Sequence, residues 1–286
     1  MSLFVPYEKM WDMPMDPTVL PEEKHIPRWF VWLTIILTFI IQFVAFRTSS
    51  THKERPVAYK GKGLVMVCNH ACYVDPYFVI LKTFPKIWVR FMAKDDMFGN
   101  GGGLGGQCMS RTGAFPVKRD SADRTSIKRA VKHLKNGEIV GVFPEGTRRN
   151  KCEYVASLHS GAAFIANMAN VPLMPVGISN NEKVIQNGRI HLPHITVHFG
   201  EALRIEDFDF LPRKERLEAC MWFLMRESHA MSFGLAPEEV DMKELYPDSP
   251  DYAETFKDFV PASRKPASEP TAAENAADAV EAGEGE

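Results

Sequence analysis

Cysteine is scarce in this chain, and the few residues present form no recognisable framework. The 286 residues include five cysteines, an odd number at irregular spacings, and we expect no secretory leader ahead of them. This pattern argues for free thiols in a reduced compartment rather than for a disulfide scaffold. Cys68, His70 and Cys72 alternate, but a closed zinc site needs four ligands, usually in paired spacings, and no second pair exists. We therefore expect no metal site. The cysteines are Cys68, Cys72, Cys108, Cys152 and Cys220.

Signals typical of nucleotide or nucleic-acid binding are also missing. Residues 99–106 are almost all glycine, so we predict a loop there, either mobile beside a substrate entrance or a plain linker. Within it, 101–106 lacks the GK[ST] ending of a phosphate-binding loop. Residues 105–152 carry eleven Lys or Arg against four Asp or Glu. Few aromatic residues interrupt this stretch, which argues against a nucleic-acid partner. A basic surface suits a phosphorylated substrate and an anionic bilayer, although a solvated helix face explains part of it equally well.

Long uncharged runs are rare, and one of 18 residues, Trp29–Phe46, stands apart. As a helix it would span ~27 Å, close to the ~30 Å hydrocarbon core of a bilayer. It begins too late for a signal peptide, and no small-residue cleavage site follows it. We predict a membrane-associated hydrophobic helix over 29–47, either spanning or lying within one leaflet, with a buried core helix as the alternative. The heavier basic flank, 47–62, would place the following domain in the cytoplasm.

Strand and helix signals alternate through the middle of the chain, which predicts an α/β domain with a central, mostly parallel or mixed sheet flanked by helices. The expected strands are 64–67, 87–91, 114–117, 138–143 and 173–178, followed by a terminal hairpin of 190–192 and 195–199. The expected helices are 75–84, 126–135, 160–168 and 213–230. The predicted organisation is a polar arm (1–28), the membrane helix (29–47), a short polar linker (48–62) leading into the α/β domain (56–235), a C-terminal extension (236–261) and a disordered acidic tail (262–286).

The string NHACYVD at 69–75 holds an imidazole and a carboxylate five residues apart, at the end of a predicted strand. Histidine titrates near neutral pH and can accept the proton of an attacking hydroxyl. A carboxylate can hold such an imidazole in one tautomer and stabilise its charged form. We expect His70 and Asp75 to meet across a tight turn as base and orienting group. Asp75 before Pro76 is equally well explained as the N-cap of a helix.

The string FPEGTR at 143–148 follows another predicted strand, so it should lie at the sheet edge where α/β folds place their sites. Arg148 can hold a phosphate through two hydrogen bonds. Glu145 can accept a hydrogen bond from an acceptor hydroxyl or anchor the loop, and Gly146 permits close approach of the backbone. An ordinary strand-exit turn with an exposed ion pair is the competing interpretation.

Taken together, these strings resemble the signature of the lysophospholipid (glycerolipid) acyltransferase superfamily. NHxxxxD at 69–75 matches its first block, and FPEGTR at 143–148 its third. GAFPVKR at 113–119 and VPLMPVG at 171–177 are similar to the second and fourth, in the same order. The first and third blocks in combination are highly specific, and the four span 69–177. One difference is Cys72, where the family often has serine.

The resemblance implies transfer of an acyl group from acyl-CoA or acyl-carrier protein to the free hydroxyl of 1-acyl-sn-glycerol 3-phosphate, giving phosphatidic acid in phospholipid biosynthesis. His70 would be the base and Asp75 its orienting group. Arg119 and Arg148 would hold the phosphate, with Glu145, Gly146 and Thr147 shaping the acceptor pocket. No cofactor is implied, because the acyl thioester is a substrate. The family often has a membrane-bound helix ahead of the catalytic domain, so the resemblance also implies the bilayer as a partner.

Four alternatives remain open from the sequence. The same chemistry on glycerol 3-phosphate, another lysophospholipid or a lysolipid would leave the motifs unchanged. A non-catalytic membrane-anchored adaptor would keep the scaffold, and a hydrolase would apply the same base to water. Cys72 beside His70 also allows a thiol nucleophile with a histidine base.

Overall fold

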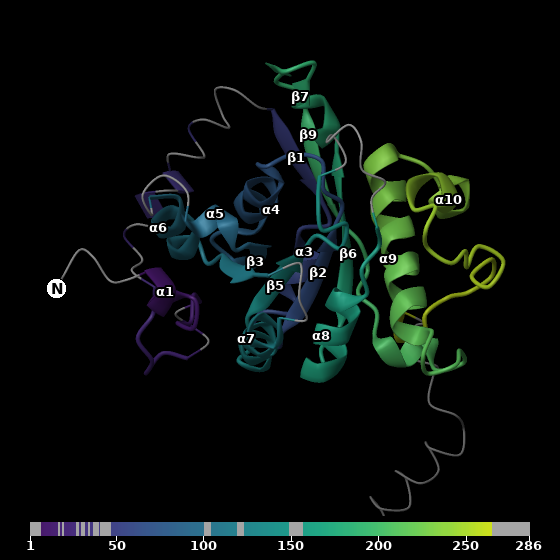
Figure 1. Ribbon diagram of the computed structural model, residues 1–286, viewed down its shortest axis with the longest axis horizontal. Coiled ribbons are helices and arrows are strands. Elements are labelled where there is room, and N and C mark those ends of the chain that lie inside the picture. The colour runs from purple at the N-terminus through teal and green to yellow at the C-terminus, as the bar shows by residue number, and fades with distance from the viewer. Residues whose placement is uncertain are drawn as a thin grey trace, which may run out of the picture.

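The computed structural model describes residues 7–16, 18, 20–26, 29, 32–33, 35–36, 40, 47–99, 104–118, 123–148 and 157–264. Its centre is a seven-stranded sheet in the order β1-β9-β6-β2-β5-β3-β4 (Figure 1). The pairs from β6 to β4 are parallel, β6 and β9 are antiparallel, and β9 and β1 are parallel to each other. The predicted class, a mostly parallel mixed sheet flanked by helices, is therefore confirmed.

The elements alternate along the chain much as the sequence predicts. The sheet contains β1 (Thr48–Thr51), β2 (Leu64–Cys68), β3 (Val89–Lys94), β4 (Phe115–Val117), β5 (Ile139–Val142), β6 (Leu173–Ser179) and β9 (Ile195–Phe199), and a separate hairpin contains β7 (Ile185–Gln186) and β8 (Arg189–Ile190). The helices are α1 (Tyr7–Met10), α3 (Glu54–Val57), α4 (Asp75–Thr83), α5 (Asp96–Gly99), α6 (Leu104–Arg111), α7 (Arg124–Lys135), α8 (Gly161–Ala169), α9 (Arg216–Phe233) and α10 (Met242–Leu245). Short 3-10 turns lie at Asn181–Lys183, Ile205–Phe208, Pro237–Glu239 and Ala262–Arg264.

Strand β2 is apolar throughout because it is covered on both faces of the sheet. Successive side chains of a strand point to opposite faces. Val65 and Val67 accordingly belong to one core, shared with α7, α8 and α9, while Leu64 and Met66 belong to a second core, shared with α4. Figure 1 shows α9 and α4 on opposite sides of the sheet. A central parallel strand buried in this way reads as a continuous hydrophobic run.

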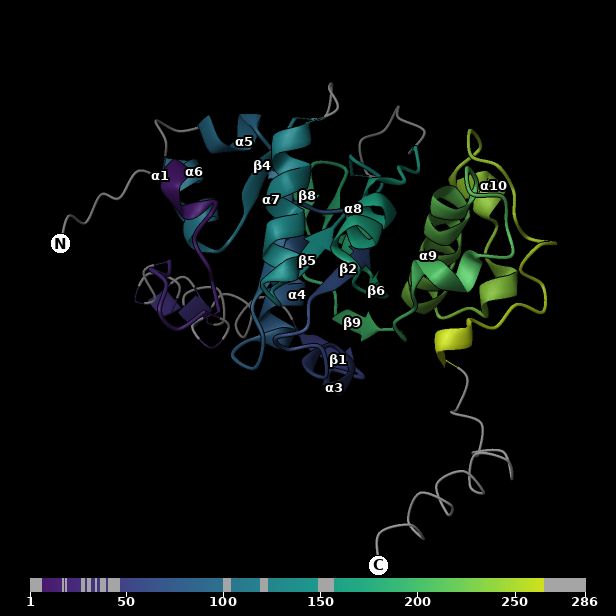
Figure 2. The same cartoon turned by 90° about the horizontal axis from the view of Figure 1, so that it is seen from below.

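The C-terminal residues pack against α9, on its side away from the sheet (Figure 2). Tyr246, Tyr252 and Phe256 are buried in the same core as Trp222 of α9. Arg264 continues this contact through an ion pair of 2.6 Å with Glu227. The structure thus describes the chain through residue 264, three residues into the segment expected to be a disordered tail, and the remainder of that tail lies outside the described residues.

Three local predictions are wrong. Residues 48–62, expected to be a linker, contain β1 and α3, because the polar strand β1 pairs with β9 at the edge of the sheet. The glycine-rich segment ends in helix α6 from residue 104 rather than continuing as a loop to 106. The terminal hairpin also pairs differently, since β8 pairs with β7, and β9 with β6 and β1.

Most of the apolar segment 29–46 lies outside the described residues. Within the residues that the structure describes, no helix is long and apolar enough to cross a membrane. Trp32 packs against Phe84 after α4 with ring centroids 4.8 Å apart, whereas Leu33, Ile36 and Ile40 are about half exposed. The described part of this segment therefore covers the domain on one side and presents apolar side chains on the other.

A buried ionic cluster attaches the N-terminal arm to the domain. Arg90 of β3 pairs with Glu138 at 3.2 Å and donates to the carbonyl oxygen of Met13 at 2.6 Å. The Glu138 carboxylate accepts from the Met15 backbone at 2.6 Å, and its second oxygen lies 2.7 Å from Nδ1 of His133. The arm thus adds backbone hydrogen bonds to a buried ion pair, and such a pair is stable only when its remaining donors and acceptors also have partners.

Candidate active site

His70 and Asp75 meet at the carboxyl edge of the sheet, directly after β2. Nδ1 of His70 lies 2.8 Å from Oδ2 of Asp75. Asp75 is fully buried, whereas the His70 side chain keeps 12% exposure. Because a carboxylate only accepts, Nδ1 must carry the proton of this hydrogen bond, and Nε2 of the neutral ring is left with a lone pair. The pair therefore has the geometry of a base and its orienting group.

The turn between His70 and Asp75 is held by the same carboxylate oxygen. Oδ2 of Asp75 accepts from the backbone N–H groups of Ala71 and Cys72, each at 2.8 Å. The predicted role of Asp75 as a helix N-cap is wrong, because α4 begins at Asp75 itself, Val74 is its N-cap residue, and no side-chain cap bond forms. The carboxylate instead points back toward the strand, where it organises the turn that carries the imidazole.

The aromatic surroundings of His70 come from Phe143 of the FPEGTR string and from strand β3. The imidazole stacks on the ring of Phe143, with centroids 4.1 Å apart and an interplanar angle of 25°. Phe143 in turn stacks on Phe91 of β3, with centroids 5.2 Å apart. Strands β2, β5 and β3 are adjacent and parallel, so the residues that follow them meet at one edge of the sheet. This register is why two strings about seventy residues apart form one site.

Glu145 is a buried residue that joins the two motifs. Its Oε1 accepts from the backbone N–H of His70 at 3.2 Å, and the residue is only 1% exposed. The same oxygen lies 3.7 Å from Nε2 of His229, a buried residue of α9 whose Nε2 is 2.9 Å from the hydroxyl of Tyr246. Of its two predicted roles, this placement favours anchoring of the loop over contact with an acceptor hydroxyl.

His229 and Tyr246 were not among the residues singled out from the sequence. They lie well beyond the last motif, and a single histidine within an 18-residue helix carries no local pattern that marks it. Their relation to Glu145 arises from the packing of α9 against β6 and β2, which only the fold reveals.

Gly146, Thr147 and Arg148 follow in the same loop. Gly146 has a φ of +64°, and a Cβ at this position would lie 3.2 Å from the His159 ring, so a larger residue here would be strained. Thr147 is partly buried in the same turn. The guanidinium of Arg148 stacks on Tyr73, a residue of the first motif. Arg119, the other residue predicted to hold phosphate, lies outside the described residues.

The thiols near the site are poorly suited to act as nucleophiles. Burial raises the pKa of the Cys72 thiol, and the nearby Asp75 carboxylate raises it further, against smaller opposing effects that include Arg148. Burial also raises the pKa of Cys68. A raised pKa leaves little thiolate at neutral pH, and thiolate is the reactive form.

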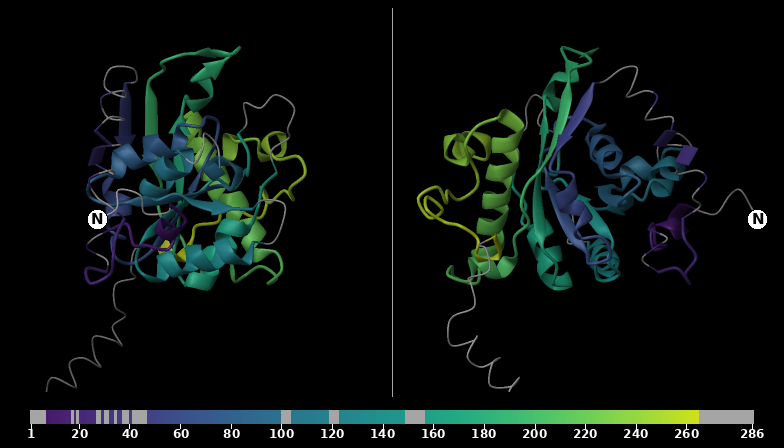
Figure 3. Two further views of the ribbon diagram at one scale, coloured as in Figure 1. Left: turned by 60° about the vertical axis from the view of Figure 1, so that its left-hand side comes forward. Right: turned by 180° about the vertical axis from the view of Figure 1, so that it is seen from behind.

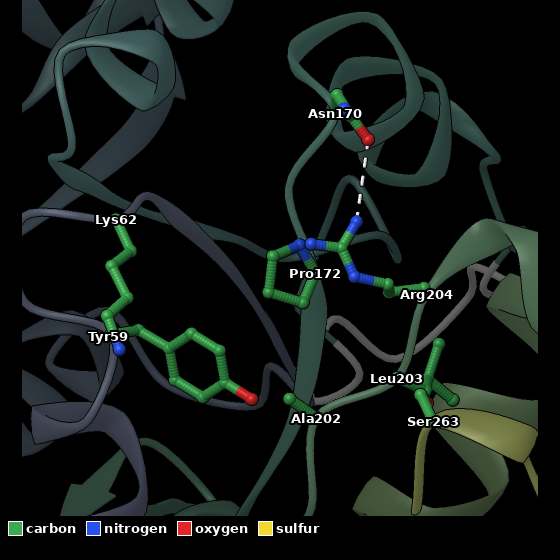
Figure 4. Close-up of a pocket in the computed structure, with 8 residues that line it drawn as sticks. All are labelled: Tyr59, Lys62, Asn170, Pro172, Ala202, Leu203, Arg204 and Ser263. Atoms are coloured by element: carbon green, nitrogen blue, oxygen red, sulfur yellow. Dashed lines mark hydrogen bonds between the residues drawn. The ribbon is translucent and has the colours of Figure 1, made fainter. Parts of the chain in front are cut away.

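The described residues form no metal-binding cluster, and the cavity found among them lies away from this site. Across the described ranges, no group of three or more His, Cys, Asp or Glu side chains is placed to hold a metal ion. A cavity of about 200 Å³ is lined by Tyr59, Lys62 and Arg204 among others (Figure 4). Lys62 and Pro172 of its lining precede β2 and β6, so this cavity lies at the amino edge of the sheet, opposite His70.

Comparison with known proteins gives one consistent family. A family model described as Acyltransferase matches residues 48–179. The chain is 37% identical over 160 residues to the 1-acyl-sn-glycerol-3-phosphate acyltransferase of Bacillus subtilis, covering 55% of this chain and 75% of the relative. It is 29% identical to the protein of the same name from Streptococcus pneumoniae, over 54% of this chain and 56% of that relative.

A solved structure agrees on the fold. The crystal structure of the 1-acyl-sn-glycerophosphate acyltransferase of Thermotoga maritima superimposes with a TM-score of 0.52 at 19% identity, over 72% of this chain and 77% of that one. At this identity the likeness supports the fold, while the sequence matches support the family. The chain belongs to the acyltransferase family that includes the 1-acyl-sn-glycerol-3-phosphate acyltransferases, and it is an O-acyltransferase.

Proposed function

We propose that this enzyme transfers a fatty acyl group from acyl-CoA or acyl-carrier protein to the free hydroxyl of 1-acyl-sn-glycerol 3-phosphate, giving phosphatidic acid. The observation that carries the proposal is the hydrogen bond of 2.8 Å between Nδ1 of His70 and the buried carboxylate of Asp75. It fixes the tautomer in which Nε2 can accept a proton from an alcohol. The names of the curated relatives supply the acceptor.

In the proposed mechanism the acceptor attacks the thioester directly. Nε2 of His70 takes the hydroxyl proton as the oxygen forms its bond to the acyl carbon, and Asp75 stabilises the resulting imidazolium. The carbon–sulfur bond then breaks, and the imidazolium returns the proton to the departing thiolate. No acyl-enzyme forms, which is consistent with the raised pKa of Cys72.

The phosphate of the acceptor is assigned to Arg148 and Arg119. Arg148 lies in the loop that also carries Phe143, whose ring stacks on His70, so one lipid can reach both the base and the guanidinium. A guanidinium fork matches a phosphate with two parallel hydrogen bonds. Gly146 and Thr147 would complete the acceptor side of the pocket, with Glu145 holding the loop in place.

We place the reaction at a membrane, with the catalytic domain on the cytoplasmic side. The apolar segment 29–46 is uncharged, and basic residues are more frequent on its C-terminal flank. The acceptor is itself an amphiphile that resides in the bilayer, so a membrane-attached enzyme meets it where it is concentrated.

The test is an acceptor panel with one labelled acyl-CoA and one labelled acyl-carrier protein. Acceptors should include 1-acyl-sn-glycerol 3-phosphate, glycerol 3-phosphate and a lysophospholipid with a larger headgroup. We expect labelled phosphatidic acid from the first, its loss in His70→Ala, and activity retained in Cys72→Ala. Loss in Cys72→Ala with activity retained in His70→Ala would overturn direct attack.

The same assay separates the alternative functions. Ester formed only on another acceptor would reassign the substrate but keep the chemistry. Free fatty acid in place of ester would indicate a hydrolase. Thioester consumption that is the same in His70→Ala and in the wild type would indicate a scaffold without catalytic use of this site.

A further inference from the structure

The β7–β8 hairpin exposes apolar side chains on a projecting tip. Ile185 and Ile190 face each other across the hairpin and are 39% and 75% exposed, and Leu192 just beyond is 57% exposed. Asn187 and Gly188 form the turn, with φ of +51° and +71°, the pattern of a tight two-residue hairpin. Three apolar side chains on so small a projection indicate a surface that is covered in use.

The hairpin leaves the sheet at the edge that carries the catalytic pair. It follows β6, which is parallel to β2, and His70 follows β2. Figure 3 shows the hairpin extending beyond the sheet, next to the start of β1. Val184 is buried at its base, where its carbonyl oxygen accepts from the backbone of His191 at 2.9 Å, so the tip is held in a fixed direction.

The base of the hairpin also contacts Arg47, the residue that follows the apolar segment 29–46. The backbone N–H of Ile195, the first residue of β9, donates to the carbonyl oxygen of Arg47 at 2.9 Å. Strand β1 then continues beside β9, with Thr48 opposite Ile195. Arg47, the residue that directly follows an uncharged run of 18 residues, therefore lies beside the stretch that leads from the hairpin into β9.

Charges on the hairpin favour an anionic surface. Lys183 and Arg189 are exposed and positive, Glu182 is negative, and the segment 182–194 carries no other Lys, Arg, Asp or Glu, so the formal charge is two minus one, or +1. Apolar side chains flanked by basic ones are typical of elements that lie in the headgroup region of a bilayer.

We propose that the β7–β8 hairpin, with Ile185, Ile190 and Leu192 at its tip, is a second bilayer contact in addition to segment 29–46. It would hold the carboxyl edge of the sheet, with His70, against the lipid surface from which the acceptor enters. The proposal rests on the membrane site of action in the proposed function, and it adds a contact from the catalytic domain itself.

The direct test places an environment-sensitive NBD label on the full-length chain. Cys68, Cys72 and Cys220 are buried, so Cys108→Ser and Cys152→Ser remove the other two thiols, and Ile190→Cys or Leu192→Cys supplies the labelling site. Val260→Cys is the matched control, because Val260 is 55% exposed and lies near Ser263, which lines the cavity at the opposite edge. On adding vesicles of phosphatidylcholine with phosphatidylglycerol, we expect a blue shift and intensity gain at 190 and 192, and no change at 260.

A second test measures how much the hairpin tip contributes to vesicle binding and to turnover of the acceptor. Ile190→Ser with Leu192→Ser should weaken co-sedimentation with these vesicles roughly tenfold, because two apolar side chains leave the interface. Val260→Ser should bind as the wild type does. Turnover of a short-chain acceptor below its critical micelle concentration should be unchanged in the double variant, whereas turnover of a vesicle-embedded acceptor should fall.

Two outcomes would overturn the proposal. One is a hairpin label that stays in a water-like environment while the chain binds vesicles. The other is a double variant that changes the sedimentation velocity of the protein but not its vesicle binding, which would assign the tip to a second copy of the chain. Neither the fluorescence of the label nor vesicle binding depends on catalysis. A failed acyl-transfer assay would therefore reject the proposed function without deciding whether the hairpin contacts the bilayer. Equally, a hairpin that stays in water would reject the bilayer contact without deciding the catalytic activity.

Discussion

The guanidinium of Arg148 lies over the ring of Tyr73, with its Cζ 3.3 Å from the ring centroid. Tyr73 comes from the first motif and Arg148 from the third, so this stack joins the two blocks at the surface of the site, as Glu145 joins them in the interior. Stacking attracts the cation to the ring face while leaving the N–H groups at the guanidinium edge directed outward. An anion can then approach the fork without displacing Tyr73.

We predict that Tyr73→Ala raises the KM for the phosphorylated acceptor about five- to tenfold, with little change in kcat. The reason is that a cation–π contact at a partly exposed position contributes about 1 kcal/mol, here as pre-organisation of Arg148. Tyr73→Phe keeps the ring and should remain close to the wild type. Steady-state kinetics with the acceptor varied at saturating donor would check this, and an equal loss in both variants would point to the phenol hydroxyl instead.

The pair of His70 and Asp75 makes a second prediction. Asp75→Asn presents an amide that no longer fixes the proton on Nδ1 or stabilises an imidazolium, so kcat should fall by about 10² to 10⁴. Thermal unfolding should be recorded beside it, because Oδ2 of Asp75 also holds the turn at Ala71 and Cys72. If the loss of kcat merely followed the loss of folded protein, Asp75 would be a structural residue only.

The sequence predicted the elements that carry the motifs and missed the contacts that join them. Periodicity and turn signals located β2, β5, β6 and α7, because each buries a regular apolar pattern. Strand β1 was missed since its residues are polar and its strand character comes from pairing with β9. His70 and Asp75 were predictable because they lie five residues apart.

Contacts that depend on packing across the sheet had no local signal. The 3.7 Å approach of His229 to Glu145 requires α9 to lie over β6, and no spacing in the chain encodes that distance. The sequence left the Asp75 carboxylate with two roles, as partner of His70 or as a helix N-cap, and the structure shows the first. The sequence shows which residue precedes a proline, but not which of two neighbouring backbone segments the carboxylate will contact.

His229 is the subject of a third prediction, as a residue that positions Glu145. His229→Ala removes a polar partner from a carboxylate that is 1% exposed, and we expect a loss of stability of about 3 kcal/mol together with a fall in kcat. Tyr246→Phe removes only the hydroxyl that contacts His229 and should have a smaller effect in the same direction.

If His229 had a purely structural role, the kcat of the folded His229→Ala enzyme would equal that of the wild type. The measurement is therefore kcat at a temperature where every variant is fully folded, combined with a double-mutant cycle between His229→Ala and Glu145→Gln. Coupling in kcat would confirm positioning through Glu145. Additive effects would separate the two residues and contradict the prediction.

The cluster that attaches the N-terminal arm gives a prediction about acid stability. Burial alone would raise the pKa of Glu138, but the Arg90 guanidinium and the His133 imidazole outweigh it and lower the pKa from 4.5 to about 2. A carboxyl group whose pKa is lower in the folded state stabilises the fold above its unfolded pKa, and this contribution is lost as pH falls through the folded value. The stabilisation by ionised Glu138 is therefore lost as the pH falls from 4.5 to about 2, and in full it amounts to about 3 kcal/mol.

Glu138→Gln should remove this dependence, because an amide does not titrate. We expect a variant that is less stable at neutral pH, since Arg90 loses its buried counter-charge, and whose unfolding free energy changes less between pH 5 and pH 2 than that of the wild type. Glu244→Gln, at an exposed position, is the matched control and should follow the wild type. Urea unfolding at half-unit pH intervals measures the free energy of unfolding of each protein. If this free energy fell equally with pH in Glu138→Gln and in the wild type between pH 5 and pH 2, another group would control acid unfolding.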